Sequence, residues 1–283
     1  SAKNAIEQIL INSKMCALGK RPICQDTGIV NVFLEVGMNV QWESELSLED
    51  MINEGVRRAY NEPDNRLRAS IVDDPLFSRK NTQDNSPAVI HTKIVKGDTL
   101  DITVAAKGGG SENKSKFTVL NPDDSLTDWV LKTIPTMGAG WCPPGMIGIG
   151  AGGTAEKAML MAKASLMEPI DINSIKTKAN PSDIEKLRID LFDQINGLGI
   201  GAQGLGGLTT VLDVKINDYP THAASLPVAM IPNCASTRHV HFSLDGTGVA
   251  ELPEVDLSLY PDLEMDVSKY TKVDLNSLTQ SQM

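Results

Sequence analysis

Three of the four cysteines stand in polar turn sequences. Cys24 lies in Arg-Pro-Ile-Cys-Gln-Asp-Thr-Gly, Cys142 in Gly-Trp-Cys-Pro-Pro-Gly and Cys234 in Ile-Pro-Asn-Cys-Ala-Ser. A cysteine that only fills a core is usually surrounded by apolar residues, so these three thiols are candidates for chemistry. Cys16 differs, because it follows Met15 within a helical pattern of apolar residues, and we interpret it as a buried helix residue.

The spacing of the three cysteines leaves several interpretations open. They lie 118 and 92 positions apart, so they form no short metal-ligand motif. On this ground alone, three unrelated buried thiols are the simplest interpretation. If the turns converge, a structural zinc ion would require a fourth ligand, whereas three thiolates suit a 4Fe–4S cluster with one iron left open for substrate.

Few other side chains are candidates for the same site. The chain has four histidines, and His222 stands in a turn, Tyr-Pro-Thr-His-Ala-Ala, which favours a role in chemistry. His239 and His241 alternate with apolar residues, as expected for one polar face of a strand. Arg68 and Arg238 could each bind a carboxylate with two parallel hydrogen bonds, although surface solvation is the ordinary role of an arginine.

Two glycine-rich stretches, 148–153 and 199–204, match the G-x-G-x-x-G pattern of dinucleotide-binding loops. Such a loop needs a strand before it and a helix after it. Two consecutive prolines precede the first stretch and a predicted strand follows the second, so we reject NAD binding. A third stretch, Lys-Gly-Gly-Gly-Ser-Glu-Asn-Lys at 107–114, is either a flexible turn or a loop whose N–H groups approach an anion.

The composition argues against several classes of partner. The 283 residues carry a net charge of −10, which argues against nucleic acid because phosphate binding requires a basic face. No apolar run is long enough to cross a membrane and no signal-peptide pattern is present, so we expect no membrane partner. Few cysteines and no export signal indicate a reducing, cytoplasmic location.

Helical and strand patterns occur together without strict alternation. Apolar spacing and capping residues predict helices at 2–18, 48–59, 154–167 and 183–195. Runs rich in β-branched residues predict strands at 30–36, 88–95, 100–106, 117–120, 209–216 and 240–244. The turn Lys-Gly-Asp at 96–98 should join two of these strands into an antiparallel hairpin. The mixture predicts an α+β fold with a largely antiparallel sheet.

Five uncommon motifs occur together in this chain. They are Cys-Gln-Asp-Thr-Gly at 24–28, Lys-Gly-Gly-Gly-Ser-x-Asn-Lys at 107–114, Cys-Pro-Pro at 142–144, Gly-Leu-Gly-Ile-Gly-Ala-Gln at 197–203 and His-x-Ala-Ser-x-Pro-Val at 222–228. In this order, and over nearly the whole chain, they resemble the class I, iron–sulfur fumarate hydratases. That family includes tartrate dehydratases, and the Gly-Gly-Gly-Ser-Glu-Asn-Lys form is more similar to fumarate hydratase.

The resemblance implies the fold of an iron–sulfur hydro-lyase alpha domain and a site within it. The ligands of a 4Fe–4S cluster with one open iron would be Cys24, Cys142 and Cys234. The residues that contact the dicarboxylate substrate would be Gln25, Arg68 and Gly109 for binding, with Asp26 and His222 for catalysis. Asp26 would take part in proton transfer, directly or by polarising the base. Lys114 and Arg238 match the family less closely, and Cys16 has no role.

The resemblance also implies a second half. Family members have a further C-terminal, or beta, domain or subunit, so residues 1–248 would be the cluster-bearing alpha domain and 249–283 an acidic linker toward it. The implied reaction is the reversible hydration of fumarate to L-malate, in a homo-oligomer such as a dimer of such units. Three alternatives stay open: a tartrate or mesaconate dehydratase, a zinc-binding protein, and a non-enzymatic module whose thiols and glycine loops contact a partner domain.

Overall fold

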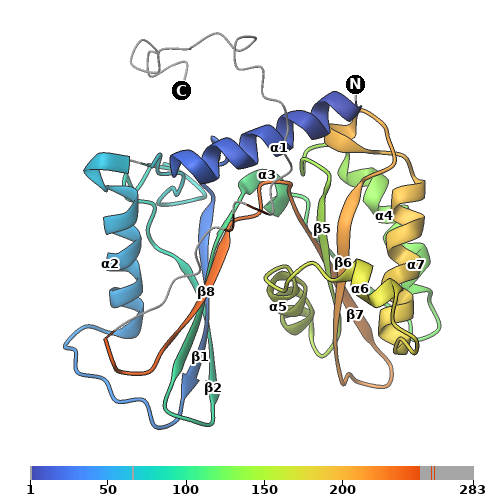
Figure 1. Cartoon of the computed structure of the whole chain (residues 1–283). Helices are drawn as coiled ribbons and strands as arrows, with labels where there is room; N and C mark the ends of the chain where they lie inside the picture. Colours follow the sequence, from blue (N-terminus) through green and yellow to red (C-terminus); the bar gives the residue numbers. More distant parts are fainter. Residues whose placement is uncertain (1, 66, 249–255, 257, 259–283) are drawn as a thin grey trace.

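The chain folds into two four-stranded sheets with helices on their faces (Figure 1). The computed structural model describes residues 2–65, 67–248, 256 and 258. The expected α+β class is confirmed, because helices and strands do not alternate and antiparallel strand pairs outnumber parallel ones. The linker expected at 249–283 falls almost entirely outside the described residues. Within the described part, no helix is long and apolar enough to cross a membrane.

The first sheet has the strand order β2-β1-β3-β8. Its strands are β1 (Ile29–Gly37), β2 (Val89–Val95), β3 (Leu100–Lys107) and β8 (His239–Leu244). The even-numbered residues of β1 from Val30 to Val36 are buried in a core with Val56 and Tyr60 of helix α2 (Leu48–Tyr60). Ser47 caps α2 as predicted, and its hydroxyl accepts a hydrogen bond from the Asp50 N–H at 3.1 Å.

The hairpin predicted around 96–98 is wrong, because β1 lies between β2 and β3. β1 runs parallel to β2, with Phe33 opposite His91, and antiparallel to β3, with Phe33 opposite Thr103. The turn at 96–98 therefore passes over the end of β1, where the Asn39 N–H donates to the Gly97 carbonyl at 2.9 Å. Most of β1 is buried and most of β2 is not, so the more apolar strand takes the central position.

The second sheet has the order β4-β7-β5-β6. Its strands are β4 (Lys116–Leu120), β5 (Gly145–Gly152), β6 (Val211–Tyr219) and β7 (Leu226–Asn233). Helices α4 (Leu126–Thr133) and α7 (Asp183–Gly197) cover its outer face, where Leu191 and Ile195 of α7 enter the largest apolar core (Figure 1). Ser182 and Glu185 form the predicted capping box at the start of α7.

The glycine run at 148–153 belongs mostly to β5, a strand that we did not predict. Helix α5 (Ala155–Ser165) packs directly against it. A Cβ added to Gly148 would lie 2.1 Å from the Ala162 carbonyl oxygen, and one added to Gly150 would lie 2.0 Å from that of Ala158. These glycines therefore allow the backbone of α5 to contact the sheet.

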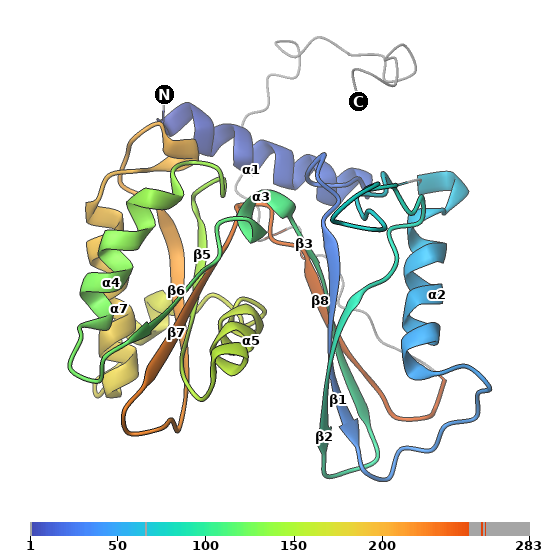
Figure 2. The same cartoon turned by 180° about the vertical axis from the view of Figure 1, so that it is seen from behind.

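Helix α1 (Ala2–Gly19) confirms the helix predicted at 2–18. It lies across the upper ends of both sheets in Figures 1 and 2. The one-turn helix α3 (Gly109–Glu112) lies beneath it, between the two sheets. The shorter elements are α6 (Ile172–Lys176) and the 3-10 turns η1 (Pro63–Asn65), η2 (Ile134–Met137) and η3 (Ala202–Gly204). The space beneath α1 is thus where segments from both sheets can meet.

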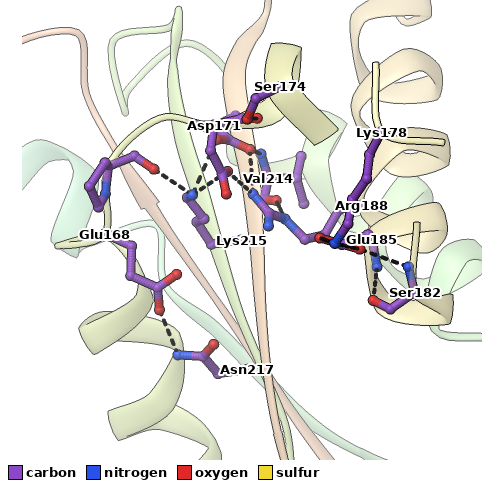
Figure 3. Close-up of polar contacts among 12 residues, drawn as sticks. Glu168, Asp171, Ser174, Lys178, Ser182, Glu185, Arg188, Val214, Lys215 and Asn217 are labelled. Carbon is purple, nitrogen blue, oxygen red and sulfur yellow. Dashed lines mark hydrogen bonds and ion pairs between the residues drawn. The ribbon is translucent and has the colours of Figure 1, made fainter. Parts of the chain in front are cut away.

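A buried ionic network connects β6, α7 and the segment after α5 (Figure 3). Arg188 Nη2 donates to Asp171 Oδ1 at 2.5 Å and to Asp213 Oδ1 at 3.2 Å. Lys215 Nζ donates to Asp171 Oδ1 at 2.6 Å and lies 3.4 Å from Asp213 Oδ2. Burial by itself raises the pKa of Asp171, but the bonds from Arg188 and Lys215 outweigh it and lower that pKa to about 2.

We expect Asp213→Ala to lower the free energy of unfolding by about 3–5 kcal/mol, because it leaves two buried cations short of a partner. Urea denaturation measures this loss. The matched control is Asp193→Ala, which breaks a 2.5 Å ion pair with Lys176 in which the Asp193 side chain is largely exposed, and should cost less than about 1 kcal/mol. Equal losses in the two variants would contradict the role of the network.

Candidate active site

The three candidate cysteines lie at strand ends near α1. Cys24 precedes β1, Cys142 precedes β5 and Cys234 follows β7. β5 and β7 are antiparallel neighbours with Met146 opposite Asn233, so the start of one strand lies beside the end of the other. The Ala235 N–H donates to the Cys142 carbonyl at 3.3 Å, which joins the two cysteine-bearing turns directly.

The electrostatics of Cys142 indicate which groups surround it. Burial raises the pKa of this thiol. Nearby acidic groups raise it further, and these are Cys234, Cys24 and Asp26. Cys142 therefore lies within electrostatic range of the other two cysteines and of Asp26. Cys142 also has a left-handed backbone with φ of +56°, which is uncommon for a residue with a side chain.

Asp26 is held by two backbone N–H groups from different segments. Its Oδ1 accepts from Gly28 N at 2.9 Å, and its Oδ2 accepts from Gly109 N at 2.7 Å. The first bond closes a local turn, and the second joins this turn to the glycine-rich stretch 107–114. That stretch forms the end of β3, α3 and the residues after it, and one of its N–H groups, that of Gly109, binds the Asp26 carboxylate.

The turn that contains Cys24 packs tightly on the first sheet. Gly28 has φ of +80°, and a Cβ there would lie 2.8 Å from the backbone of Ala106. Only glycine fits this approach. The next contacts involve Thr27, whose hydroxyl donates to the Arg68 carbonyl and whose own carbonyl accepts from Tyr60 Oη at 2.8 Å. The backbone of Arg68 is therefore bonded to the same turn. Within the turn, Gln25 accepts a hydrogen bond from the Cys24 thiol at 3.3 Å.

A buried lysine beneath α3 is a feature that the sequence analysis missed. Lys107 is 2% exposed, and its Nζ donates to Ser111 Oγ at 2.6 Å and lies 3.6 Å from Glu112 Oε2. Lys163 binds the other oxygen of Glu112 at 2.6 Å. Burial lowers the pKa of Lys107 to about 8, although Glu112 opposes this shift. The spacing of Lys107 and Ser111, four residues apart in the motif, is the signal that was available.

His222 is not brought to this site within the chain. It lies in the connection before β7, where its Nδ1 accepts from Ala224 N at 3.2 Å, whereas Cys234 follows the other end of that strand. β7 has eight residues and a strand rises about 3.3 Å per residue, so the two ends lie roughly 23 Å apart. A turn motif shows that a histidine is accessible, but it does not show at which end of a strand it lies.

Within the described ranges, no three histidine, cysteine or acidic side chains come close enough together to hold one ion. A zinc ion requires its ligands to converge on one point at about 2.0–2.3 Å. A 4Fe–4S cluster takes one thiolate on each of several irons, so its ligands surround a larger volume.

We expect a short bis-maleimide to cross-link Cys142 to Cys234 in the metal-free chain, because their turns are joined by a backbone hydrogen bond. Peptide mass mapping identifies the linked pair. The variant Cys16→Ser should leave this product unchanged, since Cys16 lies on α1 with its thiol 3.4 Å from the Pro22 carbonyl. Absence of the Cys142–Cys234 product would contradict the arrangement.

Comparison with known proteins identifies related sequences over most of this chain. The family model described as Fumarate hydratase (Fumerase) matches residues 1–243. The "Putative L(+)-tartrate dehydratase subunit alpha" of Methanocaldococcus jannaschii is 38% identical over 84% of this chain and 83% of its own length. The anaerobic class I fumarate hydratase of Escherichia coli K12 is 30% identical over 86% of this chain but only 45% of its own length. The chain therefore belongs to the fumarate hydratase (Fumerase) family.

Proposed function

We propose that this chain is the cluster-bearing half of a hydro-lyase that reversibly hydrates fumarate to L-malate. The observation that carries the proposal is the convergence of three thiols and the Asp26 carboxylate from three separate segments. Membership of the family supports the reaction class, because the relatives are described as a fumarate hydratase and tartrate dehydratases. A cytoplasmic location is part of the proposal, since thiolate ligands persist in a reducing compartment.

The donor set fits a 4Fe–4S cluster. All four cysteines lie within the described residues and none forms a disulfide, so Cys24, Cys142 and Cys234 have thiols available to hold it. When bound, the cluster would supply an open iron that acts as a Lewis acid on the substrate hydroxyl. The three proposed ligands lie in the connections before β1, before β5 and after β7.

The protein's own groups would bind and orient the dicarboxylate. Gln25 would offer its amide next to Cys24, and the backbone at Gly109, which carries no side chain, would allow a carboxylate to approach. Arg68 would add a cation, and its backbone is joined to the turn of Cys24 by the hydrogen bond from the Thr27 hydroxyl to the Arg68 carbonyl. His222 has no step in this proposal, because its turn lies at the far end of β7.

Asp26 is the group that we propose for proton transfer. In the dehydration direction, the reaction must remove a weakly acidic proton next to a carboxylate and release a hydroxide, which is a poor leaving group. Two N–H groups hold the Asp26 carboxylate in place and leave each oxygen with further accepting capacity toward the site. It could therefore accept a proton directly or polarise another base.

The proposal includes a second half of the enzyme. The chain spans 45% of the length of the Escherichia coli fumarate hydratase, and the tartrate dehydratase relatives are named as alpha subunits. We propose that the domain within 1–248 combines with a C-terminal, or beta, half that completes the substrate pocket, and that these units form a homo-oligomer. The segment 249–283 would lead toward that half.

L(+)-Tartrate is the second candidate substrate. The 38% identical relative is named as a tartrate dehydratase subunit, whereas fumarate rests on the 30% identical relative and on the Gly-Gly-Gly-Ser-Glu-Asn-Lys motif. Assays of the two-part enzyme with fumarate, mesaconate and L(+)-tartrate decide between them. A module without enzymatic activity would turn over none of the three.

We expect anaerobic reconstitution to give a brown chain with about four irons and four acid-labile sulfides. Cys142→Ser should lose most of this iron, because it removes one of three ligands. Cys16→Ser is the matched control and should keep it, since Cys16 lies apart on α1. A chain that stays colourless with the second half present, or that loses iron equally in both variants, would overturn the cluster assignment.

We expect Asp26→Asn to keep the iron content and to lower kcat by about 10²–10⁴-fold, because the amide has a similar shape but cannot accept a proton, although its single oxygen keeps only one of the two backbone bonds. Stopped-time assays of the two-part enzyme measure kcat. Asp193→Asn, an exposed carboxylate on α7, is the control for a change of charge. Near-normal turnover of the Asp26 variant at full iron content would refute the role of Asp26.

A further inference from the structure

Arg238 is fixed beside the glycine-rich loop by two hydrogen bonds to one residue. It lies between β7 and β8, four residues after Cys234. Its Nε donates to the Ala106 carbonyl at 3.0 Å, and its own carbonyl accepts from the Ala106 N–H at 3.0 Å. Because Ala106 is two residues before Gly108, the guanidinium is held at the start of that loop.

The terminal nitrogens of Arg238 are buried without a partner. Neither Nη1 nor Nη2 is accessible to solvent, and neither has an acceptor among the described residues. A guanidinium has five N–H donors and is always charged, so leaving four of them buried and unpaired is costly. Buried polar groups of this kind are rare in folded proteins, and this one calls for an anionic acceptor.

A narrow gap at the missing Cβ of Gly108 separates Arg238 Nη2 from Asp26 Oδ2. A Cβ added to Gly108 would lie 3.3 Å from Arg238 Nη2 and 3.4 Å from Asp26 Oδ2. The backbone of Gly108, with φ of −63° and ψ of 137°, is one that any residue adopts, so conformation does not require glycine here. The absence of a side chain therefore keeps open a space about one heavy atom wide between a cation and a carboxylate.

The charges around the gap are arranged asymmetrically. Burial raises the pKa of Tyr60, the charge of Arg238 lowers it and that of Asp26 raises it, so both charged groups act on the same hydroxyl. An anionic oxygen in the gap would be attracted by the guanidinium and repelled by Asp26. A carboxylate would consequently bind on the arginine side and leave Asp26 toward the rest of the substrate.

We propose that Arg238 binds one carboxylate of the dicarboxylate substrate through Nη1 and Nη2, with one carboxylate oxygen in the gap at Gly108. The inference rests on the proposed function and adds a residue to its binding site. Arginine suits this role because its planar fork matches the two oxygens of a carboxylate. Its orientation is already set by Ala106, so little side-chain freedom would be lost on binding.

The test compares the two-part enzyme carrying Arg238→Gln, Arg238→Lys or Gly108→Ala with the wild type. Iron per chain, kcat, KM for fumarate or L(+)-tartrate and Ki for succinate are measured for each. Arg58→Gln, which removes an exposed arginine on α2, is the matched control. Thermal unfolding of each variant establishes that the chain is folded.

We expect Arg238→Gln to raise KM and the succinate Ki together by about 10- to 100-fold at unchanged iron content, because two charge-assisted bonds are lost. Arg238→Lys should fall between this variant and the wild type, since lysine retains the charge without the fork. Gly108→Ala should raise both constants as well, because its methyl group fills the gap without straining the backbone. Arg58→Gln should change neither.

Two results would overturn the proposal while leaving the proposed function intact. One is full iron content with wild-type KM and Ki in both Arg238→Gln and Gly108→Ala. The other is loss of iron in Arg238→Gln with an unchanged Ki, which would mean that the guanidinium supports the cluster instead. If the wild type neither takes up iron nor turns over substrate, the proposed function fails. Calorimetry of succinate with the chain then tests the inference by itself. Succinate binding by the wild type that is lost in Arg238→Gln would support it, and no binding by the wild type would refute it.

Discussion

The hydrogen bond from Gly109 N to Asp26 Oδ2 is the contact on which the arrangement of the site depends. It joins the turn that carries Cys24 to the glycine-rich loop at the end of β3, two segments more than 80 residues apart. The bond from Gly28 N fixes the other oxygen of Asp26. A carboxylate with both oxygens held by backbone donors has one orientation, which restricts the backbone of the residues next to it. Thr27 is fixed in addition by its own bonds to Arg68 and Tyr60.

The close approach of backbones to each other provides the second constraint. α5 contacts β5 through Gly148 and Gly150, and the start of β5 meets the end of β7 at Gly145, where a Cβ would lie 1.9 Å from the Asn233 carbonyl oxygen. The turns of Cys142 and Cys234 adjoin because these two strands pair in this register. Gly148 and Gly150, from the run that resembles a nucleotide loop, are therefore packing residues, whereas Gly145 allows the close pairing beside the turns of Cys142 and Cys234.

Much of the local structure could be predicted from the residues themselves. The capped helices that begin after Ser47 and Ser182 and the strands rich in β-branched residues follow from short-range pattern, and the structure confirms them. β5 and β7 were missed because glycine and proline lower the propensity for a strand, and only contacts with neighbouring strands and with α5 compensate. The hairpin predicted at 96–98 was wrong because the sequence of a short turn does not indicate whether another strand, here β1, lies between the two strands that the turn connects.

The sequence by itself determined the family, the α+β class and the identity of the candidate ligands, because motifs and residue types are properties of short segments. It could not decide which of those residues share a site. Cys24, Cys142 and Cys234 approach one another, and His222 does not, because strand order and register set which ends of the strands coincide. The environments of Lys107 and Arg238 were likewise decided by tertiary structure, since burial and the absence of a partner depend on segments that are distant along the chain.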